Sequence, residues 1–255
     1  MSSIDIKFGS FDFADTPESW EVEISQRVIP STIPRKDGAK IPQANIGTKV
    51  ITFEGSVNAS THDNLRAARQ TMLDAILGTK DYLTLYDDRR IYCQVDSYSD
   101  DFVMGSSLKV LHFEVSFIGD NPWYESISTV TESGFFVGSG TTGTTAAINI
   151  LGVIDPPAKI TVNNTSGSSI VDDLIVENST TGEAFKYRGT LTNGKDLVVD
   201  NNVDGNGIII TNDGVNAISD FEGDIFVLKA AINNIFAYFG LLDVDIEVKY
   251  RPRYY

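Results

Sequence analysis

The chain has 255 residues, of which 42% are apolar and 22% are charged, so it can bury one large core or two ordinary ones. Its 20 basic residues stand against 35 acidic ones, and the net charge of −15 disfavours binding to nucleic acid or to anionic lipid. One cysteine and two histidines leave almost no material for a disulfide, a catalytic triad or a multi-histidine metal site, so a triad hydrolase and a metalloenzyme are disfavoured. The start lacks the pattern of a secretion signal, and no run of 18 apolar residues suggests a membrane span.

Apolar residues that alternate with polar ones predict half-buried strands in the first part of the chain. Residues 4–13, 20–24 and 50–57 show this period of two. Over residues 60–78 the apolar spacing changes to three and four, which predicts a helix capped by Ser60 or Thr61. Alternation then returns in three further segments, at residues 82–86, 91–98 and 108–117.

The segment 25–49 interrupts this pattern with three prolines and two glycines, and is therefore predicted to be a long projecting loop. A solvated loop would explain it, but the segment is also basic within an acidic chain, and such an arm suits docking to another copy of the same chain. We therefore predict that its basic residues form a subunit interface. These residues are Arg27, Arg35, Lys36, Lys40 and Lys49.

The second half of the chain differs in character from the first. Serine, threonine and glycine predominate over residues 127–145, which predicts a linker between a domain at 1–126 and a domain at 146–255. Beyond residue 146, short apolar strands recur between asparagine, glycine and aspartate turns. This arrangement is typical of a β-sandwich.

One motif in the second half suggests a ligand. Asp200, Asn202 and Asp204 stand where a calcium-binding loop has its first three ligands, with Gly205 at the sixth position. The twelfth position is Thr211, where that loop needs a glutamate, and both flanks read as strands. A hairpin turn is the better interpretation.

The remaining chemically active residues are assigned structural roles. Cys93 and His112 lie in predicted strands, and His62 lies in the first turn of the predicted helix, exposed or capping. Asp87 and Asp88 make a poor catalytic pair, because neighbouring residues of a strand point to opposite faces.

The order of these features resembles the distal tail protein (Dit) family of long-tailed bacteriophages, a hub component of the tail tip or baseplate. The segments that carry the resemblance are 50–57, 60–78, 82–92, 117–124, 196–200, 208–216, 221–228 and 248–255. One departure is the segment 230–234, Ala-Ala-Ile-Asn-Asn, where the family often has a Pro-Gly-Asn turn.

The resemblance implies a mainly β protein. Its N-terminal domain would be a β-sandwich or split barrel with one α-helix, and its C-terminal domain a galectin-like antiparallel β-sandwich. The first domain would form a homo-hexameric ring joined to the tail tube protein, and the second would carry tail-tip, tail-fibre or receptor-binding proteins. The protein would be synthesised in the bacterial host cytoplasm and reside in the virion, without catalysis, cofactor, specific nucleic-acid binding or membrane contact.

Two other functions stay open at this point. Trp20, Trp123 and the ten tyrosines offer stacking platforms for a carbohydrate-binding module or adhesin. A hydrolase that uses two carboxylates is also compatible with 35 acidic residues. The mass of the purified protein distinguishes a hexameric hub from these two alternatives.

Overall fold

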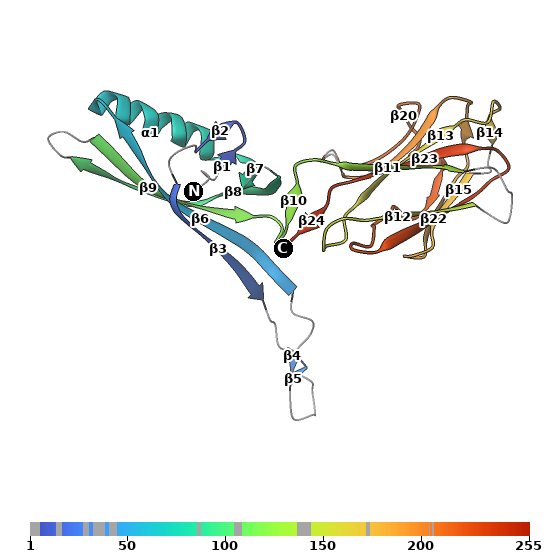
Figure 1. Cartoon of the computed structure of the whole chain (residues 1–255), viewed down its shortest axis with the longest axis horizontal. Helices are drawn as coiled ribbons and strands as arrows, with labels where there is room; N and C mark the ends of the chain where they lie inside the picture. Colours follow the sequence, from blue (N-terminus) through green and yellow to red (C-terminus); the bar gives the residue numbers. More distant parts are fainter. Residues whose placement is uncertain are drawn as a thin grey trace. The chain divides into compact units, whose positions relative to one another are not determined.

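The structure is a computed structural model, and it describes residues 6–13, 17–27, 31–32, 39–40, 45–85, 88–104, 109–136, 144–171, 174–203, 205 and 207–255. The chain divides into two units, Met1–Glu125 and Ser126–Tyr255, and each has its own hydrophobic core. Both units are built mainly from strands, as Figure 1 shows.

An antiparallel sheet in the order β2-β1-β7-β8-β9-β6-β3 forms the first unit. Its strands are β1 (Ile6–Phe8), β2 (Phe11–Asp12), β3 (Pro17–Arg27), β6 (Asn45–Ala59), β7 (Lys80–Leu85), β8 (Arg89–Met104) and β9 (Lys109–Gly119), with the short β10 (Tyr124–Ser126) beside β8. The long strands β8, β9 and β6 are direct neighbours, so each face of the sheet gathers side chains from all three.

A single helix, α1 (His62–Ile76), covers one face of this sheet, and it is the only α-helix among the described residues. The predicted helix is therefore confirmed. Its buried residues Leu65, Met72 and Ile76 fall on one side because their spacing follows the helical period, and they join the phenylalanines of the sheet in one core. The hydroxyl of Thr61 caps the first turn by accepting a hydrogen bond from the Asn64 amide, at 3.1 Å.

A loop was predicted over residues 25–49, but the residues that the structure describes in this segment are paired as strands; we call residues 25–45 the arm. Strand β3 pairs with β6 from Pro17 opposite Gly55 as far as Arg27 opposite Asn45. Beyond them, β4 (Ser31–Thr32) pairs with β5 (Ala39–Lys40), farther from the sheet (Figure 1). The backbone pairing accounts for the difference, since all three prolines that suggested a loop lie outside the described residues.

The second unit is an antiparallel sandwich of two main sheets. The larger has the order β11-β23-β13-β18-β19-β20 and the smaller β12-β22-β15-β16-β21. The strands are β11 (Val130–Phe136), β12 (Thr144–Asn149), β13 (Ala158–Asn164), β14 (Ile170–Val171), β15 (Leu174–Asn178), β16 (Glu183–Tyr187), β17 (Thr190–Leu191), β18 (Asp196–Asn201), β19 (Ile208–Asn212), β20 (Val215–Asn216), β21 (Phe221–Gly223), β22 (Asn233–Phe239), β23 (Val244–Tyr250) and β24 (Arg253–Tyr254), with a 3-10 turn η2 (Ile218–Asp220). Both sheets contribute to one core, as Phe236 and Val162 illustrate. The expected mainly β fold with one helix is thus confirmed.

The region expected to be a linker, residues 127–145, contains structure of its own. Strand β11 pairs along its whole length with β23, and β12 begins at Thr144. Because β11 lies at the edge of its sheet, residues such as Thr131, Glu132 and Ser133 are exposed, and no apolar alternation marks the strand in the sequence.

The turn at residues 230–234 is held by hydrogen bonds from side chains. The fully buried Asn234 accepts a hydrogen bond from the Lys229 amide at 2.9 Å and donates to the Lys229 carbonyl at 2.8 Å. The carboxylate of Asp155 accepts a hydrogen bond from the Ala230 amide at 3.0 Å. These contacts hold Ala231 at φ 59°, a conformation that alanine rarely adopts without support.

Candidate assembly interface

No cluster in the described part of the chain has the composition of a metal site, and no described helix is long and apolar enough to cross a membrane. Cys93 is buried in β8, which raises the pKa of its thiol to about 12, so this thiol is a poor nucleophile at neutral pH. His62 is exposed at the start of α1, as expected, and His112 lies in strand β9, as expected, where its side chain is exposed.

The calcium-like segment is a hairpin, as predicted. Strands β18 and β19 pair up to Asn201 opposite Ile208. The Asp200 carboxylate is nearly fully buried, accepts a hydrogen bond from the Val203 amide at 2.8 Å and lies 3.6 Å from the ammonium of Lys159. This carboxylate is therefore already used by the turn, and Asp204 lies outside the described residues.

The structure places the five predicted interface residues in different surroundings. The backbone of Arg27 ends β3 and that of Lys40 ends β5, so both belong to the arm. Arg35 and Lys36 lie outside the described residues. Lys49 differs from the expectation, because it lies within β6 and only 1% of it is exposed.

The inward position of Lys49 has a simple origin. It shares the alternation of Ile51 and Phe53, which begins one residue earlier than the sequence pattern suggested. Its Nζ atom lies 3.6 Å from the centre of the Tyr124 ring, in a cation–π contact. Burial, together with the nearby guanidinium of Arg89, lowers the pKa of Lys49 to about 8.

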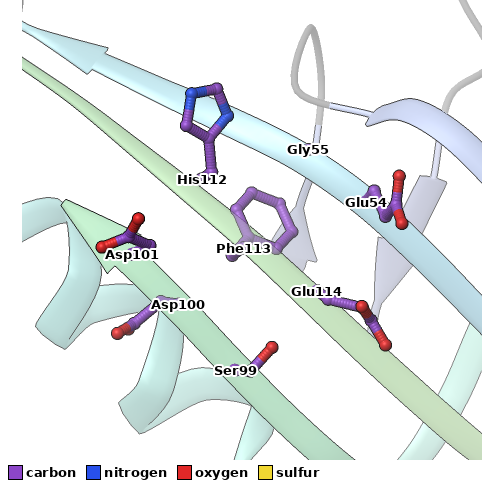
Figure 2. A pocket seen from close by; sticks show the side chains of 8 residues that line it. All are labelled: Glu54, Gly55, Ser99, Asp100, Asp101, His112, Phe113 and Glu114. Atoms are coloured by element: carbon purple, nitrogen blue, oxygen red, sulfur yellow. The ribbon is translucent and has the colours of Figure 1, made fainter. Parts of the chain in front are cut away.

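A hollow of about 300 Å³ lies on the sheet face opposite α1 (Figure 2). Two rows of register partners cross it, Glu54–Glu114–Ser99 and Ser56–His112–Asp101, on the strands β6, β9 and β8. We call the exposed residues Glu54, Ser99, Asp101, His112 and Glu114 the carboxylate face.

The adjacent Asp100 forms its hydrogen bonds on the opposite face of the sheet, which α1 covers. Its carboxylate accepts hydrogen bonds from Arg69 of α1 at 2.5 Å and from the Tyr98 hydroxyl at 2.6 Å. Burial alone would raise the pKa of Asp100, but these two hydrogen bonds lower it below its usual value. Asp100 therefore fastens the helix to the sheet, whereas the carboxylate face is open to solvent.

Sequence reasoning missed the carboxylate face. Its three carboxylates come from segments far apart in the chain, and only the pairing of β9 with both β6 and β8 brings them together. The exposed polar positions of the predicted strands were the only available signal.

The chain is thus a two-unit, mainly β protein, in which a helix-covered antiparallel sheet is followed by an antiparallel sandwich. No protein-family model and no curated protein sequence matches the chain. The crystal structure of SPP1 Dit, described as a paradigm of the hub adsorption apparatus in phages that infect Gram-positive bacteria, is similar with a TM-score of 0.72 and 13% identity, and the match covers 99% of both chains. Chains of the phage P2 baseplate in its activated conformation, with Ca or with Sr, have TM-scores of 0.49 at 8% identity and match over 96% of this chain and 90% of theirs. The chain therefore has the fold of SPP1 Dit, and the expected resemblance is confirmed at the level of fold.

Proposed function

We propose that this chain is a structural protein of a bacteriophage tail, a hub that joins the tail tube to the tail tip and its receptor-binding components. The observation that carries the proposal is the extent of the fold likeness: both units, 99% of the chain, match SPP1 Dit, whose crystal structure is described as that of a hub protein. Similarity of the β-sandwich alone would not support a function, because proteins with that fold have many different functions.

In this proposal six copies form a ring through the domain at residues 1–126, and the arm contributes to the contact between neighbours. The domain at 146–255 lies outside the ring and binds tail-fibre or receptor-binding proteins. The net charge of −15 supports a passage for the genome, because an acidic wall does not retain duplex DNA. The hub has no catalytic role in this proposal.

The mass of the purified full chain tests the proposal. Light scattering is expected to give six times 27.9 kDa, about 167 kDa, and electron microscopy a ring with a central opening. A mass of one chain at every protein concentration would contradict the hub.

The alternative of a carbohydrate-binding module has less support. Tyr187, Tyr238 and Tyr250 are buried in the core of the sandwich, where they cannot stack on a sugar. Binding of a monomeric chain to a glycan array would favour this alternative.

A further inference from the structure

The sheet of the first unit has a long edge strand on each of its two sides. On one side, β3 is the last strand and pairs only with β6, over Pro17–Arg27. On the other side, β7 pairs with β8 only as far as Gln94, so the part Ser97–Met104 is bonded along β9. Among the described residues, no other backbone group bonds to either stretch. We call these two stretches the β3 edge and the β8 edge.

Edges of this length are uncommon in a folded protein. Each presents a row of amide and carbonyl groups that a further strand can satisfy, and proteins normally shorten or cover such edges. Strand β3 has 11 residues, and the β8 edge has eight. A typical strand has about five or six residues. Both edges are therefore long enough to pair with a complete strand.

The two edges match in direction. The strands β8, β9, β6 and β3 are successive antiparallel neighbours, so β3 runs opposite to β8. Rotation about a ring axis keeps these directions. The β3 edge of one copy therefore meets the β8 edge of the next copy as an antiparallel pair.

The apolar residues of the two edges belong to the same face of the sheet. Tyr98 and Phe102 of β8 pack against the core of the first unit. Trp20 of β3 is the register partner of Phe53, which belongs to that core. Cross-strand pairs of aromatic and β-branched residues stabilise an antiparallel sheet. Pairing of the two edges would extend the core of one copy into the next.

We propose that the β3 edge of one copy pairs with the β8 edge of a neighbouring copy of this chain, so that the first units form one continuous sheet. The inference rests on the proposed ring and names the contact that closes it. Each copy offers one edge of each kind, so closure leaves neither unpaired. Full pairing of the β8 edge with like faces together places Asp101 opposite Glu21 or Glu23.

Disulfide formation in the full chain tests this pairing. Two variants carry Asp101→Cys with either Glu21→Cys or Glu23→Cys. The matched control carries Asp101→Cys with Val22→Cys, because neighbouring residues of a strand lie on opposite faces. Within one chain, β9 and β6 separate the two strands by about 14 Å, too far for a disulfide, so every link joins two copies. The native Cys93 is 0% exposed and stays in place.

One of the two variants is expected to form a ladder of up to six linked copies on a non-reducing gel after mild oxidation, and the control to stay unlinked. Both variants also remove a pair of like charges from the contact, which favours assembly. Near-UV circular dichroism and light scattering in reductant establish that each variant is folded and assembled.

Amide hydrogen exchange in the wild-type ring is a second measurement, and it needs no substitution. In an edge strand only alternate amides are bonded within the sheet, whereas a strand paired on both sides bonds nearly all of them. Strand β11 is the internal control, because it is an edge strand of the second unit. We expect the β3 edge and the β8 edge to retain about twice the fraction of slowly exchanging amides that β11 retains.

The outcomes separate this inference from the proposed function. If the wild-type chain forms the ring but the β3 edge and the β8 edge exchange like β11, the pairing is wrong and the hub stands. Assembled variants that stay unlinked, or a control that links as readily as they do, also overturn the pairing. If a variant fails to assemble, the exchange of the wild-type ring decides. A wild-type chain that never assembles overturns both.

Discussion

Lys49 shows how a single side chain can act against the stability of its unit. Its ammonium is removed from water beneath the Tyr124 ring and near the guanidinium of Arg89, and no carboxylate is among the causes that shift its pKa. The lowered pKa of Lys49 means that the unfolded chain binds a proton more readily than the folded one. The free energy of unfolding should therefore rise with pH between about 8 and 10.5, as the folded lysine loses its charge before the unfolded one does.

We expect Lys49→Met to raise the free energy of unfolding of the first unit at pH 7. The gain is at most about 3 kcal/mol, reduced by the lost cation–π contact. Urea denaturation at pH 7, 8, 9 and 10 should show a rise for the wild type that the variant lacks. Lys80→Met is the control, because Lys80 is exposed and paired with Asp120 at 3.0 Å. A variant less stable than the wild type at pH 7, with the same pH slope, would contradict this account.

The helix α1 depends on its first turn as much as on its buried face. The Thr61 hydroxyl satisfies one of the amides that the first turn leaves without a partner, and Asp63 lies at the positive end of the helix dipole. Thr61→Ala should lower the free energy of unfolding of the first unit by about 1 kcal/mol, measured by urea denaturation. Thr61→Ser should retain the cap and most of the stability. Equal losses from both variants would show that the hydroxyl does not cap the helix.

Elements with a strong apolar period were predictable from the sequence. The helix was expected at 60–78 and lies at His62–Ile76, because its buried residues repeat at helical spacing. The edge strand β11 was not predictable, because it pairs on one side only and its exposed residues Thr131, Glu132 and Ser133 leave no apolar pattern. The carboxylate face lay beyond prediction for another reason. Its charges meet only through the register of strands that are not consecutive in the chain.

At the scale of the whole molecule, two separate cores suggest that the units are separable. The first unit contains the arm, the carboxylate face and its own core cluster from Ile6 to Tyr124. A chain that ends after Ser126 should therefore fold and still form the ring, with six times its own mass in light scattering. The complementary chain from residue 127 should be monomeric. A folded but strictly monomeric first unit would show that the ring needs contacts from the second.

Because the thiol of Cys93 is buried, the protein can be labelled selectively at an introduced cysteine. It is the only cysteine in 255 residues, it is 0% exposed, and burial holds its pKa at about 12. Thiol reagents react with the thiolate. Cys93 is therefore expected not to react at neutral pH, whereas an introduced surface cysteine does. A cysteine at Ser31, in the arm, would place one dye or spin label on each copy without removing the native thiol. Energy transfer or dipolar coupling between such labels then reports how far apart the arms of neighbouring copies lie in the proposed ring.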